Sequence, residues 1–235
     1  MCTLCFGSGL SRRLFLGAGA ATLAGASLGV GALHAQPARA AETPDAALKL
    51  LAEGNERYVA NKLNERDYSA TRAARAQGQR PFAAILGCAD SRVAPELSFD
   101  RGPGELFVVR VAGNFVTTEV LGSLEFGVAV LGCRAIMVLG HTSCGAIDGT
   151  VEALQKGNTL PGHIADLVHA MKPGVEPALK GTADGLAQRA IIANVKYNVQ
   201  RLQQEKPILA EAVAAGKLKV VGGVYELATG KVSMV

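Results

Sequence analysis

The 235-residue sequence lacks any long basic tract and any basic segment interleaved with aromatic residues. Its formal charge of +4 owes three units to Arg12, Arg13 and Arg39, which lie in an N-terminal stretch without acidic residues; beyond position 40 the balance is 21 − 20 = +1. Neither a nucleic acid nor an anionic membrane is therefore an expected partner. A small-molecule substrate fits this composition better.

Cysteines are few, and their spacing excludes a disulfide-stapled scaffold. Cys2 and Cys5 fall within the first 40 residues, which leaves Cys88, Cys133 and Cys144, an odd number. Metal binding or simple burial explains such cysteines better. Charged residues make up only 19% of the chain and hydrophobic residues 49%, which excludes a disordered protein. Residues 41–235 have the length of a single compact domain.

Residues 1–40 have the pattern of an export signal. Ser-Arg-Arg-Leu-Phe-Leu occupies positions 11–16, a glycine- and alanine-rich apolar run extends to Leu33, and Ala38-Arg39-Ala40 supplies small residues for cleavage. This pattern predicts a twin-arginine signal peptide and a periplasmic or otherwise exported protein, without stable membrane association after cleavage. A membrane anchor is the alternative, because the apolar run spans about 20 residues. Its many glycines lower helix propensity and argue against that alternative.

Apolar runs and helical periodicity alternate along the rest of the chain. The runs at 82–87, 106–109 and 135–139 predict buried parallel strands, and 116–131 has helical spacing. This alternation predicts an α/β fold with a mostly parallel central sheet flanked by helices. Further expected elements are one or two amphipathic helices over 44–76, interrupted helix and loop over 156–185, a helix over 186–204, and one or two strands over 218–227.

Two polar motifs follow predicted strands directly. Cys88-Ala-Asp90-Ser-Arg92 comes after the first strand, and His141-Thr-Ser-Cys144 comes after the third. Because carboxyl ends of parallel strands meet at one edge of a sheet, residues this far apart can converge there. Two thiolates and an imidazole suit zinc with a fourth position open to water. Taken alone, each motif also has a simpler explanation, a buried cysteine or a chance spacing.

The other cysteine and the other histidines are poorer ligand candidates. Cys133 has no polar motif around it and is expected to be a small buried residue. His163 and His169 lie in or beside the glycine- and proline-rich stretch without a cysteine nearby, so we expect them at the surface.

The two motifs together resemble the paired signature of β-class carbonic anhydrases. The similarity continues through residues 93–97, 104–114 and 122–132 and covers roughly residues 45–230. The resemblance implies that residues 41–235 form a single domain of this class, with an N-terminal helical arm for dimerisation. It also implies a homodimer or higher homo-oligomer.

The resemblance further implies the site and the reaction. It assigns Cys88, His141 and Cys144 as ligands of one Zn²⁺ per subunit, Asp90 and Arg92 as a catalytic dyad, and Gln79 and Phe107 as substrate-binding residues, with Gln79 acting across the subunit interface. Zinc lowers the pKa of bound water from 15.7 to about 7, and the hydroxide hydrates carbon dioxide reversibly to bicarbonate and a proton. Two alternatives stay open: hydrolysis of carbonyl sulfide or carbon disulfide on the same framework, and a non-catalytic zinc protein.

Two positions depart from the family pattern. Phe126 stands where many relatives have a tyrosine, so the hydrogen bond from that hydroxyl is absent. Ile85 stands where relatives with a regulatory bicarbonate pocket have a tryptophan, and the chain has no tryptophan at all. We therefore expect no regulation of that kind, and an open site at neutral pH in which Asp90 pairs with Arg92 and leaves the metal to water.

Export can be tested on the leader itself. Replacing Arg12 and Arg13 with lysine should leave the protein in the cytoplasm, because the translocation machinery recognises the arginine pair. Immunoblots of periplasmic and cytoplasmic fractions measure the outcome. Undiminished periplasmic protein in the double-lysine variant would contradict the twin-arginine assignment.

Overall fold

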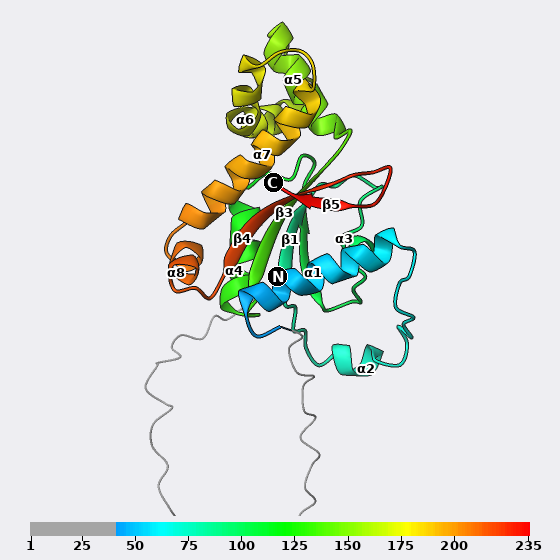
Figure 1. Ribbon diagram of the computed structural model, residues 1–235. Coiled ribbons are helices and arrows are strands. Elements are labelled where there is room, and N and C mark those ends of the chain that lie inside the picture. The colour runs from blue at the N-terminus through cyan, green and yellow to red at the C-terminus, as the bar shows by residue number, and fades with distance from the viewer. Residues whose placement is uncertain (1–40) are drawn as a thin grey trace, which may run out of the picture. The chain divides into compact units, whose positions relative to one another are not determined.

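The computed structural model describes residues 41–235, so the predicted signal peptide at 1–40 lies outside the described residues. A five-stranded sheet forms the centre, in the order β2-β1-β3-β4-β5 (Figure 1). The first four strands are parallel, and the short β5 runs antiparallel to β4. The strands are β1 (Ala83–Gly87), β2 (Leu106–Arg110), β3 (Ala135–His141), β4 (Lys219–Tyr225) and β5 (Val232–Met234).

Helices connect the strands, as expected for a parallel sheet. They are α1 (Pro44–Val59), α2 (Arg72–Arg75), α3 (Pro95–Ser98), α4 (Thr118–Ala129), α5 (Gly145–Lys156), α6 (Ile164–Val175), the 3₁₀ helix η1 (Glu176–Lys180), α7 (Leu186–Gln204) and α8 (Ile208–Ala214). Threonine caps set two of the starts: Thr43 and Thr117 each accept a backbone N–H three residues on, at 3.2 Å. No helix within residues 41–235 is both long and apolar enough to cross a bilayer.

Alternating side chains of the central strands belong to two different hydrophobic clusters. In β1, Ala84 and Leu86 pack with residues of α4, α5 and α7, whereas Ala83 and Ile85 pack with residues of α1. Every residue of β1 and β3 is buried, which explains their continuous apolar sequence. The polar residues that follow β1 and β3 therefore lie at the carboxyl end of two neighbouring interior strands.

The predicted α/β class, the three early strands and the helix over 186–204 are confirmed. Of the one or two strands expected over 218–227 the structure has one, because Gly222 and Gly223 lie inside a continuous β4. A Cβ on Gly222 would lie 2.6 Å from Val195 Cγ1, so this glycine allows α7 to approach the sheet and makes no turn. The second strand of the region, β5, begins only at Val232.

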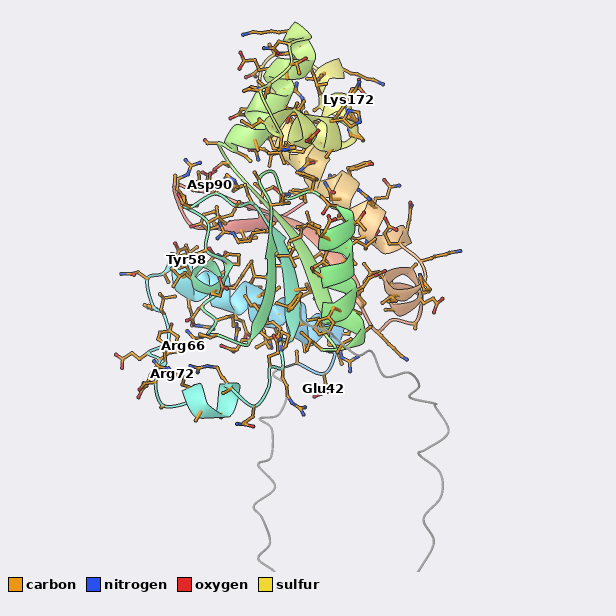
Figure 2. The ribbon with its side chains drawn as sticks, turned by 180° about the vertical axis from the view of Figure 1, so that it is seen from behind. Glu42, Tyr58, Arg66, Arg72, Asp90 and Lys172 are labelled. Atoms are coloured by element: carbon orange, nitrogen blue, oxygen red, sulfur yellow. The ribbon has the colours of Figure 1, made fainter. Side chains whose placement is uncertain are left out.

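A buried carboxylate anchors the segment between α1 and β1. Asp100 accepts a hydrogen bond from Arg57 Nε at 2.6 Å and pairs with Arg66, whose place on this segment is labelled in Figure 2. Burial alone would raise the pKa of Asp100, but the two guanidinium groups outweigh it and lower the pKa. Asp100 therefore stays ionised in the fold and ties the chain after α1 to the end of α3.

Candidate metal centre

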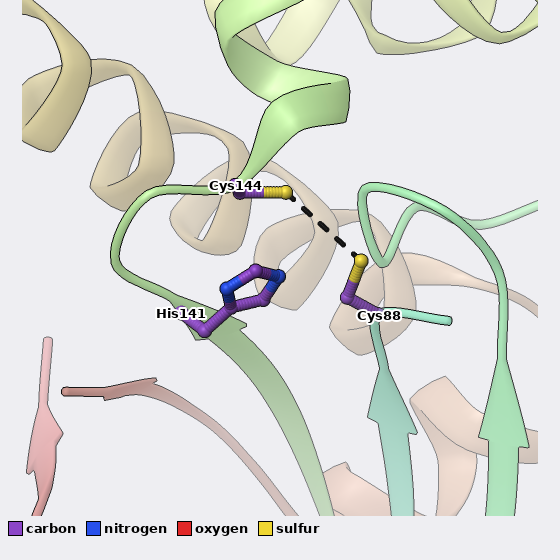
Figure 3. A group of neighbouring side chains, drawn as sticks. All are labelled: Cys88, His141 and Cys144. Atoms are coloured by element: carbon purple, nitrogen blue, oxygen red, sulfur yellow. Dashed lines mark hydrogen bonds between the residues drawn. The ribbon is translucent and has the colours of Figure 1, made fainter. Parts of the chain in front are cut away.

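Three buried side chains meet where β1 and β3 end. Cys88 follows β1 directly, His141 is the last residue of β3, and Cys144 is the N-cap of α5. Their relative exposures are 3%, 1% and 1%. One ligand atom from each lies within 4.8 Å of the others, and Figure 3 shows the imidazole facing the gap between the two sulfurs.

The arrangement fits a metal ion held by two sulfurs and one nitrogen. The Cys88 and Cys144 Sγ atoms are 4.0 Å apart, close to the roughly 3.8 Å expected for two sulfurs on one tetrahedral ion at about 2.3 Å. His141 Nδ1 lies 2.9 Å from the Thr142 carbonyl oxygen, which places the ring hydrogen on Nδ1. Nε2 is buried and has no hydrogen-bond partner within the described residues. An unpartnered buried nitrogen facing two sulfurs is what a ligand set presents to an ion.

Proton sharing between the sulfurs prepares one of them to bind a cation. A hydrogen bond from the Cys144 thiol lowers the pKa of Cys88 to about 4, and the same bond raises the pKa of Cys144. Backbone N–H groups of Ala146 and Ile147, at the start of α5, act in the opposite direction on Cys144 and favour its thiolate. One sulfur is therefore charged near neutral pH, and a bound cation would displace the proton that remains.

Asp90 and Arg92 form a two-point pair beside this cluster. Arg92 Nε donates to Asp90 Oδ1 at 2.9 Å, and Arg92 Nη2 donates to Asp90 Oδ2 at 2.6 Å. Nη2 also donates to the Ser143 carbonyl oxygen at 3.1 Å. These bonds hold the pKa of Asp90 well below its usual range. Asp90 Oδ2 lies 3.7 Å from His141 Nε2, so an ionised carboxylate borders the site while its charge is matched by Arg92.

Two supporting groups were missed by sequence reasoning. Arg110, at the end of β2, donates to the carbonyl oxygens of Cys88 at 2.8 Å and Asp90 at 2.6 Å. Thr142 Oγ1 donates to Glu226 at 2.9 Å and accepts the Leu227 N–H at 3.1 Å, which fixes the loop after His141. The position of Arg110 directly after an apolar run was the only sequence signal for it, and Glu226 gave none.

The two predicted substrate residues lie away from the cluster within this chain. Phe107 is level with Ala84 in the sheet, near the amino end of β1, and Gln79 precedes that strand. Phe107 instead packs against Phe126, with ring centroids 6.3 Å apart. Their assignment to a substrate pocket, which for Gln79 was expected across a subunit interface, stays a prediction.

The remaining candidates lie where the sequence predicted. Cys133 is buried at 2% exposure, with its Sγ 3.7 Å from the Pro81 carbonyl oxygen. His163 and His169 are exposed, and His163 Nδ1 lies 2.8 Å from its neighbour Asp166 Oδ2.

Known proteins share both the sequence and the fold. The carbonic anhydrase family model matches residues 83–232. Carbonic anhydrase 2 of Mycobacterium tuberculosis is 42% identical over 191 residues, which cover 80% of this chain and 91% of that protein. The chain belongs to the β-carbonic anhydrase family. A Coccomyxa β-carbonic anhydrase, solved in complex with acetazolamide, superposes with a TM-score of 0.64 at 31% identity, covering 71% of this chain and 77% of that one.

A solved structure of lower sequence identity has the same fold. A β-carbonic anhydrase from Sordaria macrospora, described as tetrameric, has a TM-score of 0.60 at 24% identity and covers 72% of this chain and 89% of that one. The family and the Cys–His–Cys cluster together establish a carbonic anhydrase with a site that could hold a metal ion.

Metal content tests the ligand set. Cys88→Ser, His141→Ala and Cys144→Ser should each lose most of the bound metal, because each removes one of three buried donors. Cys133→Ser is the matched control, since it changes a buried cysteine outside the cluster. Elemental analysis after purification measures the outcome. Metal loss in Cys133→Ser with retention in Cys144→Ser would show that the ligand set is wrong.

Proposed function

We propose that this protein binds one Zn²⁺ per subunit through Cys88, His141 and Cys144 and catalyses the reversible hydration of carbon dioxide to bicarbonate and a proton. The observation that carries the proposal is a buried pair of sulfurs with an unpartnered imidazole nitrogen, bordered by an ionised carboxylate. Two sulfurs and one nitrogen leave one position of a tetrahedral ion open. When bound, zinc would supply the Lewis acidity that makes water a nucleophile near neutral pH.

Asp90 is proposed to orient the nucleophile. Its pKa lies well below the usual range because Arg92 donates two hydrogen bonds to it, so the carboxylate is an acceptor throughout the physiological pH range. An acceptor beside the site can take a hydrogen bond from the attacking oxygen and point its lone pair toward carbon dioxide. Asp90 lies beside the Cys88–His141–Cys144 group and is not a member of it, which supports an open fourth position.

Arg92 and Arg110 are proposed to keep that carboxylate in place. Arg92 holds the two carboxylate oxygens and reaches across to Ser143, next to the ligand Cys144. Arg110 holds the backbone of the same loop through the Cys88 and Asp90 carbonyls. Bidentate pairing restricts the rotation of Asp90, and this limits its access to the metal position.

Hydration kinetics test the roles of Asp90 and Arg92. In the parent, hydration should rise with pH and then level off, and Asp90 should add no further inflection above pH 5, because its pKa is already lowered by Arg92. Asp90→Asn should slow hydration roughly 10–100-fold while retaining zinc. Arg92→Ala should lower activity across the whole pH range, since the freed carboxylate can then turn toward the metal. Stopped-flow assays with zinc analysis measure both.

Other outcomes would change the assignment. Parental rates in Asp90→Asn would remove this carboxylate from the mechanism. A zinc-loaded parent that does not hydrate carbon dioxide between pH 7 and 9 would overturn the proposed reaction.

We also propose that the protein forms a homodimer or higher homo-oligomer. An apolar groove of about 740 Å³ runs between α1 and β5, and its rim residues Val59 and Met234 are 45% and 57% exposed. Exposed apolar area of this kind favours a protein interface. Apolar lining residues of the groove include Leu48, Ala52, Phe99, Met137 and Val232.

Light scattering coupled to gel filtration tests the association. The parent should elute at twice the monomer mass or more, and Val59→Lys with Met234→Lys should shift it toward the monomer, because two charges would be buried. Ile164→Lys is the control, since Ile164 is 52% exposed on α6 and outside the groove. A monomeric parent at micromolar concentration would contradict the proposal.

A further inference from the structure

A backbone amide contacts one of the candidate metal ligands from the side of the core. Gly113 N–H donates to Cys88 Sγ at 3.3 Å, and the contact is buried. Gly113 has φ +86°, and a Cβ there would lie 2.2 Å from Met171 Sδ. Only glycine therefore fits this conformation and this packing, and it brings the amide onto the sulfur.

Two buried asparagines on α7 hold the segment that carries this amide. Asn194 Nδ2 donates to the Gly113 carbonyl oxygen at 2.9 Å. Asn198, one turn further along α7, accepts the Val116 N–H at 2.9 Å and donates to Asn194 Oδ1 at 3.2 Å. Each asparagine is only 1% exposed. Arg201, a further turn along, donates to the Val116 carbonyl oxygen at 2.8 Å.

Close packing by helix α6 restricts the conformation of the Asn194 side chain. Helix α6 passes so close that a Cβ on Gly174 would lie 2.9 Å from Asn194 Oδ1 and 3.1 Å from its Cα. Asn198 orients the amide by donating to that same Oδ1, so the Nδ2 end faces Gly113. Burying two amides among apolar residues is costly unless they are hydrogen-bonded. Here Asn194 Nδ2 bonds to Gly113 and Asn198 Oδ1 bonds to Val116, while Asn198 Nδ2 bonds back to Asn194.

We propose that Asn194 is a positioning residue of the metal centre, which holds Gly113 so that its amide stays hydrogen-bonded to the Cys88 sulfur. The inference rests on the proposed zinc site. A hydrogen bond to a thiolate withdraws electron density from it and weakens its donation to a bound ion. Two thiolates neutralise the formal charge of Zn²⁺, so the amide restores part of the ion's electrophilic character. Asn198 supports this by fixing the orientation of Asn194.

Cobalt substitution reports on this hydrogen bond without an activity assay. Co²⁺ replaces zinc in the full-length protein, and the thiolate-to-cobalt charge-transfer band is recorded in the near ultraviolet. Asn194→Ala should move this band to longer wavelength, because a sulfur without its hydrogen bond gives up an electron more easily. Asn198→Ala should produce a smaller shift in the same direction.

Val199→Ala is the matched control on the same helix. Val199 packs near Gly222 of β4, and no hydrogen bond joins its side chain to residues 113–116. This variant loses packing from α7 and should leave the cobalt band unmoved. Circular dichroism on each variant establishes that it is folded, and if Asn194→Ala does not fold, the shift in Asn198→Ala decides the question.

The outcomes separate this inference from the proposed function. An unmoved band in the folded asparagine variants would overturn the role of Asn194, and so would an equal shift in Val199→Ala. A parent protein that takes up Co²⁺ without any thiolate band would overturn the proposed metal centre itself.

Discussion

Two sulfurs and an imidazole lie buried together where β1 and β3 end. The surrounding groups offset the cost of burying negative charge on those sulfurs. The sulfurs are 4.0 Å apart, and neither Cys88 nor Cys144 has more than 3% exposure. Concentrating negative charge in such a place is costly unless cations and hydrogen-bond donors surround it. The start of α5, the Gly113 amide and the nearby arginines provide this surrounding, and a bound ion would complete it.

Glycines bring the supporting helix close enough to serve the site. A Cβ on Gly140, directly before His141, would lie 2.7 Å from Val195 Cγ2, and one on Gly222 would lie 2.6 Å from Val195 Cγ1. Because β3 and β4 present no side chain at these points, α7 packs directly on the sheet. That approach places Asn194 within hydrogen-bond reach of Gly113. The backbone beside Cys88 is therefore fixed by a helix more than 80 residues away in sequence.

A few charged side chains set the electrostatics beside the Cys88–His141–Cys144 group. Asp90 is ionised and paired with Arg92, while Arg110 donates to the carbonyl oxygens of Cys88 and of Asp90 itself. The loop thus keeps one conformation through backbone and side-chain bonds together. This is consistent with a carboxylate that acts as an acceptor for a reacting molecule and does not itself occupy the metal.

The amino-acid sequence was sufficient to predict the α/β class, the buried central strands and the two strand-end motifs, because apolar runs and motif spacing are local properties. It also identified Cys88, His141 and Cys144, since parallel strands bring their carboxyl ends together whatever their separation in the chain. Three features could be seen only in the folded chain: Gly222 lies inside a strand, Arg110 holds the Cys88 loop, and Asn194 and Asn198 support Gly113. These facts depend on which helix face meets which loop, and that is set by packing across the whole core, which no local pattern encodes.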